Sequence, residues 1–146
     1  MTKIKFTLPV RPITKKNAMQ ILTNPKTGKP FMIPSKQYRD FEKECKPYLR
    51  RIKEEIGEIN YPINLECVFY IDAHRRCDLT NLLSAIDDTL TASGLIIDDN
   101  RDIIAGHDGS RVYCDMRNPR IEIQITELKE YEQWKNTKDI QTSLFN

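Results

Sequence analysis

Acidic side chains gather in one part of the sequence, between Asp78 and Asp99. Asp78 stands near the middle of the chain, and the pair Asp98-Asp99 follows three large apolar residues. Two carboxylates about 4 Å apart repel by ~1 kcal/mol in water and by ~4 kcal/mol near a protein surface, so they need a cation, either a metal ion or a neighbouring Arg. Mg²⁺ suits such a place because it takes one or two carboxylates and keeps positions for water and a substrate phosphate. Asp78, Asp98 and Asp99 are therefore candidates for a catalytic metal site of phosphodiester chemistry, and an ordinary structural or solvated role is the alternative that the residues leave open.

Basic residues stand near these acids, although the net charge of the whole chain is only +2. They collect at Lys15-Lys16, Lys26/Lys29, Arg50-Arg51-Lys53 and His74-Arg75-Arg76. Arg75 and Arg76 come directly before Asp78, which favours contact with a phosphate at that place. Lys15 and Lys16 suit either a DNA backbone or plain loop charge. Acids that hold cations beside bases that hold phosphate are what a phosphodiesterase needs, but composition alone favours solvated surface charge.

The acids are carried by an expected helix from about Asp78 to Thr91, with Gly94 beyond its end. At 100° per residue, one face of this helix is apolar and carries Leu79, Leu82, Leu83, Ile86 and Leu90. An acid at the helix start also suits an N-cap, so a structural role for Asp78 stays open beside the catalytic one. The turn at Gly94 could bring Asp98 or Asp99 back beside Asp78.

The other polar residues of this helix are expected to have lesser roles. Asp88 lies about 15 Å further along the axis than Asp78, too far to share a metal ion through a straight helix. We expect Asp88, Asn81 and Thr80 to contact the metal ligands without binding the metal ion themselves, or to have a structural role. Asp87 points away from this flank and is predicted to be a solvated charge.

The remaining segments predict the framework that positions these residues. Strands are expected at residues 4–8, 63–71, 103–105 and 120–125, with 63–71 central because its second half is apolar on both faces. Apolar residues at steps of three and four predict a long helix from Ser35 to Gly57. Turn formers at residues 24–30 predict an irregular hairpin with a basic tip. No repeat or linker divides the sequence, so we predict one α+β domain over residues 1–146, a mixed β-sheet packed by two main helices, with its core at about 3–127 and a tail at 128–146.

Composition excludes several classes of protein. No apolar run approaches the ~20 residues that a membrane-spanning helix needs. Residues 1–6 alternate polar and apolar types, unlike a secretory signal, so a cytoplasmic location is expected. The four scattered cysteines form no C-x-x-C pair, which argues against zinc or disulfides and predicts reduced, partly buried thiols at Cys45 and Cys67. His74 and His107 have no spacing partner and are expected on the surface or in turns.

The order of the motifs resembles a known family. Asp78-Leu79-Thr80-Asn81-Leu82, then Asp88-Thr89-Leu90, then Gly94 and Asp98-Asp99 is similar to the central motif of the RusA-family Holliday junction resolvases. The resemblance covers roughly residues 3 to 127. It implies a homodimer that binds branched DNA, namely four-way junctions, and cuts two strands symmetrically with Mg²⁺, for which Mn²⁺ could substitute. It also implies that Asp78 and Asp99 are metal ligands.

Two positions depart from the family pattern. Thr80 stands where the family has a second acid, and Ser84 stands where it has a catalytic lysine. Asp98 or Asp72 could replace the lost acid, and the lost cation could be replaced by Lys15, Lys16, Arg75 or Arg76. We expect a rearranged but active resolvase. A non-catalytic junction-binding homologue, and a nuclease that cuts flaps or single strands, are the alternatives.

Overall fold

The computed structural model describes residues 2–14, 19–74 and 76–130. Its elements are β1 (Lys3–Leu8), β2 (Met19–Thr23), β3 (Pro30–Pro34), α1 (Lys36–Ile56), β4 (Ile63–Ile71), α2 (Leu79–Ala92), β5 (Ile104–Gly106), β6 (Arg111–Cys114) and β7 (Arg120–Glu127). Lys15, Lys16, Arg75 and residues 131–146 of the expected tail fall outside the described residues.

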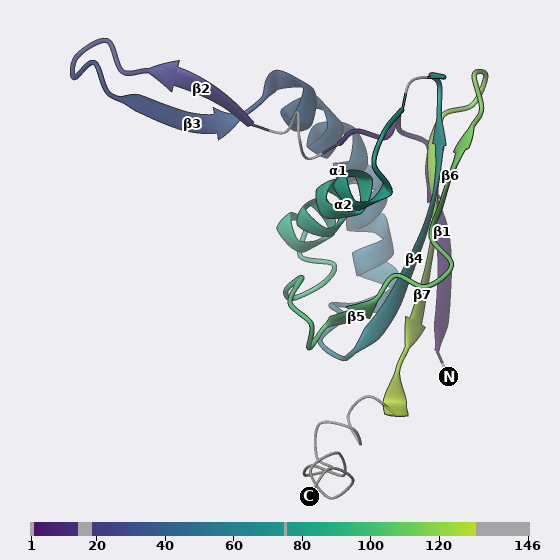
Figure 1. Ribbon diagram of the computed structural model, residues 1–146. Helices are drawn as coiled ribbons and strands as arrows, with labels where there is room; N and C mark the ends of the chain where they lie inside the picture. Colours follow the sequence, from purple (N-terminus) through teal and green to yellow (C-terminus); the bar gives the residue numbers. More distant parts are fainter. Residues whose placement is uncertain (1, 15–18, 75, 131–146) are drawn as a thin grey trace, which may run out of the picture.

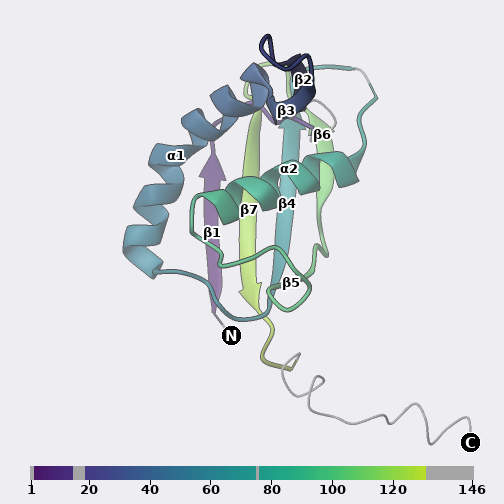
Figure 2. The ribbon, with the colours of Figure 1, turned by 90° about the vertical axis from the view of Figure 1, so that its left-hand side faces the viewer.

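A five-stranded mixed sheet forms the body, with β1, β7 and β4 side by side in that order. The pairs β1–β7 and β7–β4 are antiparallel, whereas the short strands β5 and β6 pair in parallel with the start and the end of β4. Both helices cover the same face of this sheet (Figures 1 and 2). The predicted α+β fold, with a mixed sheet and two main helices, is confirmed.

Most of the predicted elements form because their apolar residues share one face. In α1 the buried residues are Tyr38, Phe41, Cys45 and Leu49, and the hydroxyl of Ser35 caps the helix by accepting a hydrogen bond of 3.1 Å from the backbone N–H of Tyr38. The helix ends at Gly57, whose φ of 78° favours glycine. The strand β6 was not predicted, because it lies at the sheet edge and only Val112 of its side chains packs against the core.

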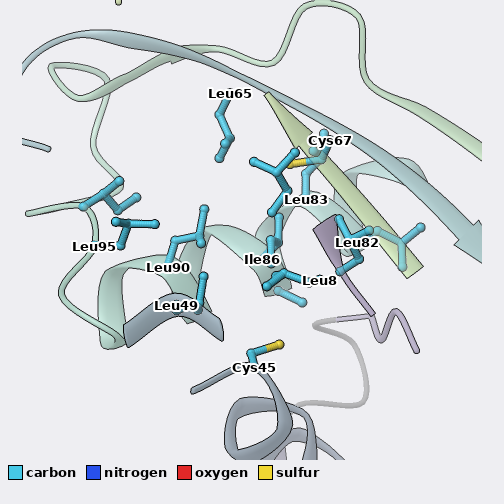
Figure 3. Close-up of a cluster of buried hydrophobic side chains, with 14 of the residues drawn as sticks. Leu8, Cys45, Leu49, Leu65, Cys67, Leu82, Leu83, Ile86, Leu90 and Leu95 are labelled. Carbon is cyan, nitrogen blue, oxygen red and sulfur yellow. The ribbon is translucent and has the colours of Figure 1, made fainter. Parts of the chain in front are cut away.

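The core lies between α2 and the sheet. Leu82, Leu83, Ile86 and Leu90 of α2 are buried there with Leu65 and Cys67 of β4, as Figure 3 shows. Each fully buried side chain of this size contributes roughly 1.5–3 kcal/mol. The apolar face predicted for α2 is confirmed, although Leu79 at its beginning is only half-buried.

The strands β2 and β3 form a separate two-stranded arm that projects from the body at the beginning of α1 (Figure 1). Ile21 and Met32 face one another across the arm and are 70% and 62% exposed, so the arm buries little of its own apolar surface. Lys26 and Lys29 lie at its turn, where the side chain of Asn24 accepts a hydrogen bond from the backbone of Lys26. The predicted hairpin with a basic tip is confirmed.

The cysteines are unpaired, and Cys45 and Cys67 are fully buried. Burial raises the pKa of the Cys45 thiol to about 12 and that of Cys67 well above its usual value, which keeps both thiols protonated and inert. Both thiols were expected to be partly buried, and their burial is in fact complete. Within the described residues, no helix is both long and apolar enough to cross a membrane.

Candidate active site

Asp78 occupies the N-cap position of α2, with extended backbone angles, but its carboxylate makes no capping hydrogen bond. Its backbone carbonyl accepts from the N–H groups of Asn81 and Leu82, at 3.1 and 3.2 Å. The side-chain amide of Asn81 donates to a carboxylate oxygen of Asp78 at 3.2 Å. Since Asp78 is exposed, this carboxylate faces solvent at the positive end of the helix dipole. The Asp78 side chain therefore does not cap the helix, although its position would allow it to.

The two positions that depart from the resolvase pattern lie on the same helix. The hydroxyl of Ser84 donates to the backbone carbonyl of Thr80 at 2.9 Å, one helical turn earlier. Thr80 itself is exposed. Neither residue supplies a carboxylate or a cation beside Asp78. The charged side chains near the beginning of α2 are therefore Asp78 itself and those of the loop before it.

The loop before α2 begins at the end of β4. Asp72, a candidate for the missing acid, lies 2.8 Å from the guanidinium of Arg11 and therefore already has a cation as its partner. The imidazole of His74 lies 3.8 Å from the sulfur of Cys114. Arg76 is exposed, and no ion pair engages it within the part of the chain that the structure describes. Arg76 is thus available to an external anion.

The pair Asp98-Asp99 lies in a turn after α2. One oxygen of Asp98 accepts from the backbone N–H of Asp99 at 2.7 Å, and the other accepts from the Asn100 amide at 3.0 Å. Burial, a hydrogen bond with Asp98 and the negative charge of Asp88 raise the pKa of the Asp99 carboxyl. Asp99 therefore lies beside Asp88, in the third turn of α2.

The expected meeting of Asp98 or Asp99 with Asp78 does not occur within one chain. Asp78 and Asp88 are ten residues apart on one helix, about 15 Å along its axis. After Gly94 the chain turns back, but Ile96, in a β-bridge with Ile59, still lies at the end of α2, where its backbone N–H meets the carbonyl of Leu90. Within the described residues, no three His, Cys, Asp or Glu side chains converge where they could hold a metal ion.

Comparison with known proteins agrees with this arrangement of motifs. The family model described as Endodeoxyribonuclease RusA matches residues 9–126, which include both helices and all the acids discussed above. The chain belongs to the RusA family. The resemblance read from the central motif is thereby confirmed, and the family is one of endodeoxyribonucleases. The comparison with curated proteins gives no match.

This RusA chain also contains a polar contact that the sequence did not predict. The two nitrogens of His107 lie 2.9 Å from a carboxylate oxygen of Asp87 and 2.8 Å from the carbonyl oxygen of Leu65. The expectation of a solvated Asp87 is wrong, since its side chain is mostly buried. His107 was expected on the surface or in a turn; it does lie in the β5–β6 turn, but its side chain is mostly buried. Leu83 and Leu90, four residues before and three after Asp87, place Asp87 on the row of α2 that faces the sheet, and this spacing was the available signal.

His107 also completes the edge of the central strand in this RusA fold. β7 pairs with one edge of β4 along its length, whereas β5 and β6 pair with the two ends of the other edge and leave the middle of that edge without a partner strand. There the carbonyl of Leu65 meets His107, and the backbone N–H of Cys67 donates to the hydroxyl of Ser110 at 3.0 Å. Two side chains of the β5–β6 loop thus replace ladder hydrogen bonds, as buried backbone groups require.

Proposed function

We propose that this RusA-family chain is a Mg²⁺-dependent endonuclease that resolves four-way DNA junctions by paired, symmetric nicks in recombination and repair. Family membership supports endodeoxyribonuclease activity. The observation that carries the finer proposal is the exposed Asp78 carboxylate, which makes no cap and is held by Asn81. An acid in this state is free to accept a metal ion or a metal-bound water.

The metal ligands of the proposal do not fit together within one chain. Mg²⁺ takes one or two carboxylates and fills its other positions with water and substrate phosphate. Asp78 supplies one carboxylate, but Asp98 and Asp99 lie toward the other end of α2. When bound, the ion would activate water and stabilise the leaving oxygen.

We propose a homodimer on the same grounds. A two-fold dimer could set Asp78 of one copy against the Asp98-Asp99 pair of the other, which one chain cannot do. The two-fold symmetry of a four-way junction offers two equivalent cleavage points, and an isologous dimer can address both. In this arrangement Asn81 holds Asp78, Asp88 adjoins Asp99, and Arg76 contacts a phosphate.

A second candidate is a junction-binding protein that does not cut. It is supported by Ser84, which stands where the family pattern has a lysine. The Ser84 hydroxyl donates its hydrogen bond to the backbone carbonyl of Thr80 in the same helix. Lysine at that position would offer a positive charge to the phosphate, and a serine hydroxyl cannot.

A cleavage assay separates the two candidates. Purified protein is incubated with four-way, flapped and linear duplex DNA in Mg²⁺, Mn²⁺ or EDTA. We expect symmetric nicks in the junction that need the metal ion and are lost in Asp78→Asn, whereas the control Asp108→Asn, an exposed acid in the β5–β6 turn, retains them. Junction binding without any cleavage would establish the second candidate. Equal cutting of flapped or linear DNA would show a nuclease of broader structure preference.

A further inference from the structure

Cations form a stripe along α1. Arg39, Lys43, Lys46, Arg50 and Lys53 follow one another at steps of four, three, four and three residues, which places them on one face of the helix. The stripe is about 21 Å long at 1.5 Å per residue. Its successive members are like charges at the spacing where side chains on a helix meet, so each neighbouring pair destabilises the free helix slightly.

The stripe borders a groove between α1 and the end of α2. The groove has a volume of about 800 Å³, and Thr89 and Ala92 of α2 and the following C-cap residue Ser93 contribute to its lining. A second hollow of about 640 Å³ is lined by α1 alone and shares Lys43, Lys46, Arg50 and Glu54 with the first. The two helices lie next to each other on the same face of the sheet (Figure 2).

The five cations are not equally engaged. Arg50 pairs with Glu54 at 3.4 Å, and the ammonium of Lys53 lies against Gly94 at the end of α2, where it offsets the negative end of the helix dipole. Arg39, Lys43 and Lys46 are exposed, and no ion pair holds them among the residues that the structure describes. Three cations at one end of the stripe are therefore available to an external anion.

That end of the stripe lies near the third turn of α2, because Arg39 and Thr89 line the same groove. The hydroxyl of Tyr38, the residue before Arg39, lies 3.5 Å from the hydroxyl of Thr89, the residue after Asp88. A strand lying along the stripe would therefore approach, at the Arg39 end, the turn of α2 that carries Asp88 and Thr89.

We propose that the α1–α2 groove binds the sugar–phosphate backbone of one DNA arm through Arg39, Lys43 and Lys46. From Arg39 to Lys46 the stripe is about 10 Å long, which matches roughly three phosphates of one strand at 3.4 Å per step along the duplex axis. Polyanion binding also relieves the repulsion between the like charges. The inference deepens the proposed nuclease function and rests on it for the choice of DNA as the ligand.

The test is a binding titration in EDTA, so that it does not depend on cleavage. The variant Arg39→Gln/Lys43→Gln/Lys46→Gln is compared with Lys3→Gln/Lys5→Gln/Arg117→Gln, which removes three exposed cations elsewhere and has the same net charge. Fluorescence anisotropy with a labelled junction and a labelled linear duplex is recorded between 50 and 200 mM salt. Circular dichroism verifies that both variants are folded, as substitutions of exposed side chains should be.

We expect the groove variant to bind both DNAs at least about tenfold more weakly, with a slope of log Kd against log salt that is lower by roughly 2–3, since each phosphate contact contributes about 0.9. The control should bind nearly as the wild type does. In the opposite direction, Glu54→Gln frees Arg50 and should tighten binding. Equal losses in the groove variant and the control would overturn the inference, as would a wild-type chain that does not bind DNA.

These outcomes are independent of the cleavage result. A groove variant that loses binding in a protein that cuts no DNA would support the groove and reject the nuclease. A protein that cuts junctions while its groove variant binds DNA normally would support the nuclease and reject the groove.

Discussion

The imidazole Nε2 of His107 lies 2.9 Å from a carboxylate oxygen of Asp87 and joins the β5–β6 loop to α2. The other ring nitrogen meets the carbonyl of Leu65. Both partners are hydrogen-bond acceptors, so both contacts are hydrogen bonds only when the ring donates from both nitrogens, as the imidazolium form does. This contact is a structural ion pair, since it lies on the sheet side of α2, away from the flank that carries Asp78.

The first prediction concerns the pH dependence of stability. Burial lowers the pKa of His107, but the hydrogen bond and charge of Asp87 and the carbonyl of Leu65 outweigh it, so that the pKa is raised above its ordinary value of about 6.5. A raised folded-state pKa gives stability that is fully present below about pH 6.5 and is lost as the pH rises through the folded-state value. Urea unfolding should therefore show a lower free energy of unfolding at pH 9 than at pH 6.

Two histidine variants check this assignment. His107→Ala should cost about 2 kcal/mol at pH 6, because it removes charge-assisted hydrogen bonds and leaves Asp87 unpaired. It should also flatten the pH profile between 6 and 9. The control His74→Ala, at an exposed histidine, should keep the wild-type profile. A profile that stays unchanged in His107→Ala would show that another group titrates.

The second prediction separates function from helix capping at Asp78. Ser35 caps α1 through the backbone N–H of Tyr38, whereas Asp78 stands at the same position of α2 without such a bond. Thermal unfolding should show that Ser35→Ala costs about 1 kcal/mol and that Asp78→Asn changes stability by less than about 0.5 kcal/mol. The Asp78→Asn variant should nevertheless lose DNA cleavage. If Asp78→Asn destabilises the protein as much as Ser35→Ala, the acid has a capping role after all.

The third prediction concerns the departure from the family pattern at Thr80. Thr80→Asp adds a carboxylate to the first turn of α2, two residues from Asp78, where the helix dipole favours negative charge. Since Thr80 is exposed, the change should be tolerated, and Mg²⁺ binding measured by calorimetry should tighten, on the order of tenfold.

The control for this variant is Thr2→Asp, which adds the same charge at an exposed position near the N-terminus. It should leave metal affinity unchanged. Should Thr80→Asp alter neither affinity nor cleavage, another carboxylate already holds the position, and a partner subunit would be the place to look for it.

The sequence by itself determined the helices, the central strand and the family. Each depends on a local pattern: apolar residues at steps of three and four in α1 and α2, apolar residues on both faces of β4, and the ordered motif from Asp78 to Asp99. The sequence also placed Asp88 away from Asp78, because distance along a helix follows from residue number alone.

Only the tertiary structure decided which distant residues meet. Asp99 lies beside Asp88, in the chain that follows the Ile59–Ile96 bridge, and His107 lies between Asp87 of α2 and the Leu65 carbonyl on the β4 edge that no strand pairs at its middle. Both contacts join segments whose spacing in the sequence carries no periodic signal. The path of a turn and the gaps in a sheet depend on how the whole chain packs, and local patterns do not encode them.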